Sequence, residues 1–143
     1  MEIIITNLQK RPLHQKLLRG QGLKILAHEK VFRGKLSLVF VTDRTIKLLN
    51  QRFLSKNQPT DVLAFDFSKG QFKSRKAIFA EIIISTDTAQ RNAKAFKTNF
   101  GYELTLYLAH GILHLLGFDD HDRKKIKAMR SKESQLLNFL KAK

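Results

Sequence analysis

The sequence contains no cysteine, no tryptophan and only two prolines among its 143 residues. Without cysteine the chain can form no disulfide and no thiolate metal site, so histidine, aspartate and glutamate are the strong metal ligands that remain. This usage fits a reducing cytoplasm. The chain also lacks a charged and then apolar leader of the secretory kind, and it lacks an apolar run of roughly 18 residues that could span a membrane. We therefore expect a cytoplasmic protein with no membrane partner.

Acidic residues are also scarce. The chain has 12 aspartates and glutamates against 27 lysines and arginines, which gives a formal net charge of +15. A small domain needs far less charge to stay in solution, so the excess favours a polyanionic partner. Anionic lipid is the competing explanation, but no segment joins a wide apolar face to a basic one outside the elements needed for the core. RNA or DNA is therefore the preferred partner.

Hydrophobic periodicity divides the chain into strands and helices. Continuous or alternating apolar runs predict strands at residues 2–6, 35–41, 62–67 and 78–85. Apolar residues three and four positions apart predict helices at residues 12–30, 43–53, 88–97 and 122–142, and another helix that follows a break at Gly101 and runs from residue 104 toward Gly117. Residues 68–76 are expected to form a basic hairpin or loop.

The order of these elements predicts a single α/β (or α+β) domain over residues 1–143. Its sheet should be small, four-stranded and mostly parallel, with helices packed against it. One antiparallel pair is expected between Val62 and Ser85, because the segment that joins these two strands is too short and polar for a helical crossover. The helix that follows Gly101 is apolar almost all round, which predicts a central position for it.

Two histidines at the end of this central helix are the main candidate for chemistry. His110 and His114 are four residues apart, so they are neighbours on one helix face with their imidazoles side by side. Gly117 then allows the chain to leave the helix in a left-handed turn, which can bring residues 119–121 back toward the pair. Two helical histidines and one ligand after a glycine turn give three protein ligands, the number that leaves a fourth zinc position open.

A simpler interpretation also exists, since a histidine on an apolar helix is usually a hydrogen-bonded core residue.

The spacing matches the metzincin layout H-E-x-x-H-x-x-G-x-x-H, except that Gly111 stands where those proteases carry the general-base glutamate. This difference argues against a peptidase. Chemistry at this site needs another base, or it relies on the metal and on the substrate itself, for which a ribose 2′-hydroxyl nucleophile is one alternative.

The stretch from His110 to His121, HGILHLLGFDDH, resembles the signature H-G-x-L-H-L-x-G-Y-D-H of the YbeY proteins, which are bacterial endoribonucleases and rRNA maturation factors. Phe118 replaces the usual tyrosine. A second block of the family, L-N-x-x-Y-R-x-x-D-x-P-T-D-V-L-S-F, corresponds here to ten residues: Leu49, Asn50, Phe53, Pro59, Thr60, Asp61, Val62, Leu63, Ala64 and Phe65. The two blocks order most of the chain, and the first is the more specific.

The resemblance implies a zinc-dependent endoribonuclease that is specific for single strands. It further implies a role in rRNA maturation, at the 3′ end of 16S rRNA, and in ribosome quality control. The partners would be rRNA or a ribosomal subunit, together with ribosome-associated proteins. One Zn²⁺ ion per chain would be held by His110, His114 and a third ligand.

The chain departs from the family pattern at two positions that bear on the chemistry. Without a gap, the third metal histidine of the family falls on Asp120, and the nearest histidine, His121, comes one residue late. Asp120 keeps the register and is an acceptable oxygen ligand, whereas His121 is the more usual ligand type but needs a shifted loop. We favour Asp120. The family arginine falls on Leu54, so Arg52 becomes the candidate catalytic cation that neutralises the scissile phosphate.

Four further cations are candidate RNA contacts, namely Lys124, Lys125, Arg91 and Lys94. Leu54 and the missing glutamate also support an alternative function, in which the protein is a non-catalytic RNA-binding or ribosome-binding assembly factor with a structural metal. A third interpretation is a metal-dependent hydrolase of another substrate. These alternatives differ in whether RNA is bound and whether it is cut.

Overall fold

The computed structural model describes residues 1–54, 60–68 and 77–142. The strands within this part of the chain are β1 (Glu2–Asn7), β2 (Arg33–Val41), β3 (Val62–Asp66) and β4 (Ala77–Ser85). The helices are α1 (Gln15–His28), α2 (Asp43–Leu54), α3 (Thr86–Phe96), α4 (Phe100–Leu115) and α5 (Arg123–Ala142). None of these helices combines the length and the apolar character needed to cross a membrane.

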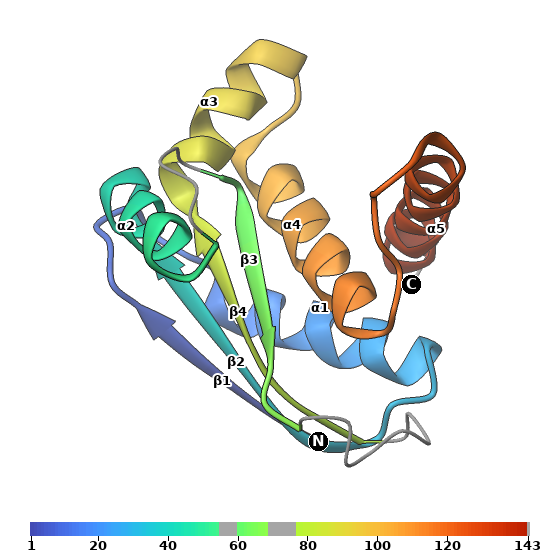
Figure 1. Cartoon of the computed structure of the whole chain (residues 1–143). Coiled ribbons are helices and arrows are strands. Elements are labelled where there is room, and N and C mark those ends of the chain that lie inside the picture. The colour runs from blue at the N-terminus through green and yellow to red at the C-terminus, as the bar shows by residue number, and fades with distance from the viewer. Residues whose placement is uncertain (55–59, 69–76, 143) are drawn as a thin grey trace.

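The strands form one mixed sheet with the order β1-β2-β4-β3 (Figure 1). β1 pairs with β2 in parallel, and β2 pairs with β4 in parallel. β3 pairs with β4 antiparallel, as expected for the two strands between Val62 and Ser85. The molecule is thus a single α/β domain with a mixed four-stranded sheet, which confirms the predicted fold class.

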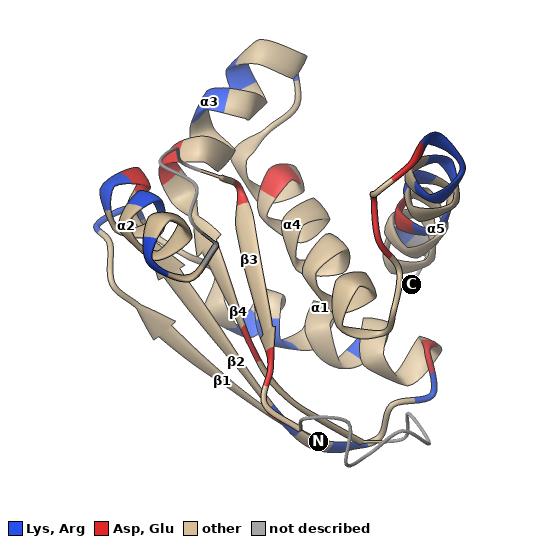
Figure 2. Cartoon of the chain, viewed as in Figure 1, with Lys and Arg blue, Asp and Glu red and all other residues tan. Residues whose placement is uncertain are grey.

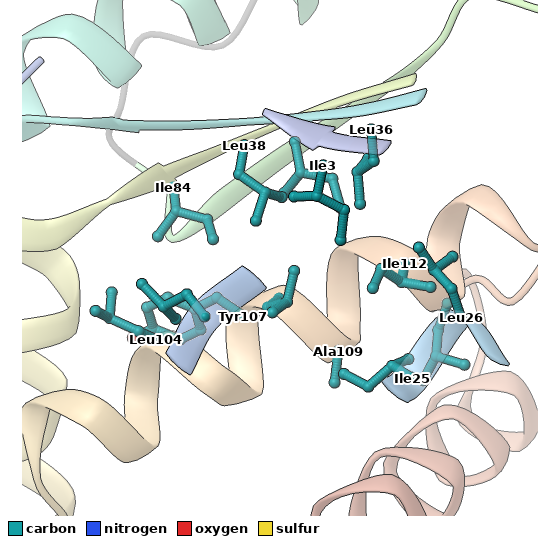
Figure 3. Close-up of a cluster of buried hydrophobic side chains, with 14 of the residues drawn as sticks. Ile3, Ile25, Leu26, Leu36, Leu38, Ile84, Leu104, Tyr107, Ala109 and Ile112 are labelled. Carbon is teal, nitrogen blue, oxygen red and sulfur yellow. The ribbon is translucent and has the colours of Figure 1, made fainter. Parts of the chain in front are cut away.

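One face of the sheet forms the main core with α1 and α4. Along β2 the alternation predicted for this strand buries Leu36, Leu38 and Phe40 completely. Figure 3 shows side chains of the sheet, Leu36 and Leu38 among them, directed toward α4, where Ile112 is fully buried as well. Each such leucine or isoleucine contributes about 1.5–3 kcal/mol to folding through its burial. The core therefore fixes α4 against the middle of the sheet, and α5 packs on the outer side of α4.

The other face of the sheet is covered in part by α2. Val41, Ile46, Leu63 and Ile83 form a second, smaller cluster of buried residues there. Because neighbouring residues of a strand point to opposite faces, Ile83 faces α2 while the residues on either side of it face α4. Helices α2 and α4 therefore lie on opposite faces of the sheet.

The structure corrects two predicted helix starts. α1 begins at Gln15, three residues after Pro12, because the Gln9 side chain bonds the backbone of Arg11 and holds the preceding segment in a loop. Gly101 does not break the chain but lies in the first turn of α4. There the Asn99 side chain accepts a hydrogen bond from the Tyr102 N–H at 2.8 Å, and this cap starts the helix before the glycine.

Strand β1 lies at the edge of the sheet. One of its faces packs on the core, so Ile3 is buried while Ile4 is 39% exposed. The basic loop expected at residues 68–76 lies, apart from Ser68, outside the described residues.

Candidate metal centre

The turn at Gly117 ends α4 and reverses the chain. Gly117 has a φ of +104°, a left-handed conformation that side chains with a Cβ rarely adopt. Its N–H donates to the His114 carbonyl, and the Phe118 N–H donates to the Leu113 carbonyl, which closes the helix as a Schellman motif. The following segment then runs back beside α4 to the start of α5 (Figure 1). This is the glycine turn predicted from the sequence.

The reversal brings a carboxylate to the two histidines. His110, His114 and Asp120 each offer one ligand atom, and these atoms all lie within 4.8 Å of one another. The two imidazole centroids are 4.8 Å apart with an interplanar angle of 67°. His110 is half-buried, whereas Asp120 is exposed. Among the described residues, His110, His114 and Asp120 form the one group of three histidine or acidic side chains that could hold a metal ion.

His121, the alternative third ligand, is not a member of this group. Its backbone N–H donates to Asp119 Oδ1 at 3.2 Å. This bond closes a tight turn at Asp119 and lowers the pKa of that carboxyl, which is also close to the Lys125 ammonium at 3.7 Å. The geometry of the turn therefore favours Asp120 over His121.

Glu133 of α5 supports the first histidine from outside the cluster. One of its carboxylate oxygens contacts Nδ1 of His110 at hydrogen-bond distance. When Nδ1–H donates to a carboxylate, the lone pair of the imidazole is left on Nε2. Glu133 is not among the residues predicted from the sequence. A signal did exist, because it is the sole acidic residue in the 20 residues of α5.

The two histidines titrate in opposite directions. Burial lowers the pKa of His110, but the hydrogen bond and charge of Glu133, with the charges of Asp61 and Asp120, outweigh it and raise the pKa above 6.5. Burial and the neighbouring His110 lower the pKa of His114 below 6.5. His114 thus presents a neutral imidazole at pH 7, the form that binds metals.

A cavity of about 180 Å³ opens beside the cluster. Since one water occupies about 30 Å³ in the liquid, this space has room for a few waters or one small polar group. Its walls come from α4, from the segment after Gly117 and from α5. The residues that line it are His110, Asp120, Ile126, Met129, Arg130 and Glu133.

The predicted cations occupy different places around this centre. Arg52 is exposed on α2, the helix on the other face of the sheet from α4. Lys124 and Lys125 are exposed in the first turn of α5, and Lys94 is exposed on α3. Figure 2 shows that cations gather on α3 and on the end of α5 that lies toward α3, with α4 between them. Two basic segments therefore flank the helix that carries the histidines.

Arg91, the fourth predicted RNA contact, is engaged within the protein. Its guanidinium forms an ion pair with Asp43 at the start of α2, and it donates to the Thr88 hydroxyl at 3.1 Å. The hydroxyls of Ser85 and Thr88 both donate to Asp43 Oδ1 at 2.7 Å. Burial raises the pKa of Asp43, but these donors lower it more, so that the pKa falls below 3.8. Arg91 thus joins α3 to α2.

Comparison with known proteins gives concordant matches. A family model described as "Endoribonuclease YbeY" matches residues 4–141. A protein of Syntrophus aciditrophicus with that name is 34% identical over 98% of this chain and 90% of its own length. Another from Anaeromyxobacter dehalogenans is 41% identical over 83% of this chain and 61% of its own length. The solution structure of TM1509 from Thermotoga maritima is similar with a TM-score of 0.68 and 28% identity, over 96% of this chain and 88% of that one.

Proposed function

The chain belongs to the YbeY endoribonuclease family, and from this premise we propose that it is a metal-dependent endoribonuclease that cleaves single-stranded RNA. The observation that carries the proposal is the convergence of His110, His114 and Asp120 beside an open cavity. The net charge of +15 supports a polyanionic substrate. A peptide or neutral substrate would give no reason for that charge.

The donor set fits a zinc ion, one per chain. Two imidazoles and one carboxylate are ordinary zinc ligands, with donor-to-metal distances of about 2.0–2.2 Å. Their ligand atoms lie within 4.8 Å of one another, so these three side chains would hold the ion between them. Glu133 occupies Nδ1 of His110 and leaves Nε2 as the ring nitrogen that would bind the ion.

The roles of the protein groups follow from their surroundings. A metal held by His110, His114 and Asp120 would supply Lewis-acid chemistry to the phosphodiester. Glu133 orients His110, His114 stays neutral, and the Asp120 carboxylate adds the negative charge that favours cation binding. The cavity admits the scissile phosphate to the open side of this ligand set.

Gly111 explains why the helix carries no general base. A Cβ at this position would lie 3.0 Å from two side-chain atoms of Ile82, because α4 packs closely on β4. A glutamate there would require the Ile82 side chain to move by a few tenths of an ångström. The proton of the attacking nucleophile must therefore be accepted by a group other than a glutamate at residue 111. This fits a nucleophile supplied by the substrate or by solvent.

The finer physiological assignment follows the family. We propose action on rRNA, at the 3′ end of 16S rRNA, and in ribosome quality control, with a ribosomal subunit and its associated proteins as partners in the cytoplasm. Lys124, Lys125 and Lys94 are proposed contacts to the RNA backbone. Arg52 remains the candidate that the sequence pattern suggests for the scissile phosphate, although its helix lies on the other face of the sheet.

The decisive experiment compares zinc-loaded wild-type protein with a His114→Ala variant on a single-stranded rRNA fragment. The variant should keep its circular dichroism spectrum and its RNA affinity, because His114 contributes to neither the core nor the basic segments. The rate of RNA cleavage should fall at least a hundredfold, because one of the three metal ligands is lost. Equal cleavage by the two proteins would refute the enzyme assignment and favour the non-catalytic assembly factor, for which Leu54 in the family arginine position speaks.

A further inference from the structure

The cavity beside the metal centre has one cation in its wall. Its polar lining consists of His110, Asp120, Arg130 and Glu133, so that two carboxylates face a single guanidinium. A phosphodiester that approaches this acidic site needs positive charge beyond that of the ion. Arg130 is the single lysine or arginine among the lining residues, so its side chain can provide this positive charge.

Helix geometry holds Arg130 in this position. The lining residues Ile126, Met129, Arg130 and Glu133 follow the spacing i, i+3, i+4, i+7, which places them on one face of α5. Met129 is 2% exposed and fixes this face against the core. Glu133, three residues beyond Arg130, is fixed by its contact with His110. Arg130 therefore projects from a rigid element.

Among the residues that the structure describes, the Arg130 guanidinium has no anionic partner. It is exposed, and no carboxylate among the described residues lies within the 4.0 Å of an ion pair with it. Other cations of the chain are paired: Arg91 with Asp43, and Lys132 with Glu29 at 3.1 Å. The nearby Glu133 carboxylate is already engaged by His110. All the donors of Arg130 are thus available to a ligand.

We propose that Arg130 is the catalytic side chain that binds the non-bridging oxygens of the scissile phosphodiester. This inference rests on the proposed function and assigns its substrate-binding cation. The planar guanidinium donates two parallel hydrogen bonds to a phosphate, and it stays protonated throughout. It forms no covalent bond and transfers no proton; it stabilises the charge that develops on the phosphoryl oxygens. Arg130 thus fills the role for which the sequence pattern suggests Arg52.

The test is an Arg130→Gln variant with Arg123→Gln as its matched control. Arg123 is exposed on the same face of α5 two turns earlier and does not line the cavity. Its substitution by glutamine removes the same charge as Arg130→Gln. Inorganic phosphate is titrated into each zinc-loaded protein by calorimetry. Arg130→Gln should weaken phosphate binding on the order of tenfold, and Arg123→Gln less than twofold. Zinc stoichiometry should be unchanged in both, because neither residue is a ligand.

Cleavage of a single-stranded RNA provides the second measurement. Arg130→Gln should lower kcat/KM about a hundredfold, and Arg130→Lys should recover part of it by restoring charge without the planar fork. Equal phosphate affinity of the two glutamine variants would overturn the assignment of Arg130, even where wild-type protein cleaves RNA. If wild-type protein does not cleave RNA, the proposed function fails, while the phosphate titration still decides whether Arg130 binds phosphate.

Discussion

The cluster around Asp43 and the cluster around His110 both join polar side chains from neighbouring segments of the fold, and they differ in how the acceptor atoms are matched. Asp43 accepts hydrogen bonds from Ser85, Thr88 and Arg91, and its own N–H donates to Asp87 at 2.9 Å. His110, His114 and Asp120 instead offer ligand atoms that lie within 4.8 Å of one another and are open to an ion. A cluster whose acceptors are saturated by the protein's own donors stabilises the fold, whereas a cluster of converging lone pairs is suited to bind a cation.

Removal of the carboxylate ligand should give the largest effect. An Asp120→Ala variant should lose zinc affinity by at least a hundredfold, because two imidazoles alone hold the ion weakly. A His121→Ala variant should keep wild-type affinity, since His121 lies outside the ligand group. Elemental analysis after purification without chelator or affinity metal measures the retained ion. Zinc lost from His121→Ala and kept by Asp120→Ala would reverse the assignment of the third ligand.

Removal of the supporting carboxylate should have an intermediate effect. Glu133→Gln should weaken zinc binding about 10–100-fold, the usual effect of losing an outer partner of a ligating histidine. Glu29→Gln is the matched control, because the Glu29 side chain is 12% exposed against 13% for Glu133 and also contacts a histidine, but that histidine, His28, is not a member of the ligand group. Competition with a zinc-binding dye gives both constants. Equal losses in the two variants would mean that Glu133 does not orient His110.

A substitution in the cluster around Asp43 should change the free energy of unfolding and leave metal binding unchanged. Asp43→Asn should lower the free energy of unfolding at pH 7 by about 1 kcal/mol, because the charge that Ser85, Thr88 and Arg91 stabilise is lost. Zinc affinity should stay at the wild-type value. Urea unfolding and zinc titration of the same preparations measure the two quantities.

The difference in unfolding free energy between wild type and Asp43→Asn should depend on pH in a definite direction. Since the folded-state pKa of Asp43 lies below its ordinary value of 3.8, the carboxylate contributes stability at pH above 3.8. This contribution disappears as the pH falls through the folded-state pKa. The difference between wild type and Asp43→Asn should therefore shrink below pH 3.8, and a difference that grows there would contradict the role given to the charge.

The sequence could predict what depends on local spacing. The four-residue interval between the histidines and the glycine after the helix predicted the paired imidazoles and the reversal at Gly117, because both follow from helix geometry. The alternation in β2 likewise predicted its buried face. Each of these features needs only a few neighbouring residues to be specified.

Features that depend on tertiary packing could not be read from the pattern. Glu133 reaches His110 only because α5 packs on α4, and nothing local to either helix specifies that contact. The choice between Asp120 and His121 depends on a turn closed by Asp119, which a one-residue shift in an alignment cannot represent. Arg52 was favoured by its proximity in sequence to Leu54, whereas Arg130 is close to the histidines only in space.

The contact of Gly111 with Ile82 also bears on how this scaffold can evolve. Zinc peptidases and this site share a histidine spacing, so a glutamate introduced at residue 111 is the shortest change in sequence between the two chemistries. The sheet stands in that path, because a Cβ at residue 111 would lie 3.0 Å from two side-chain atoms of Ile82, which would have to move by a few tenths of an ångström to admit it. Close packing of helix on sheet thus adds a packing cost to any exchange of one chemistry for the other at this position.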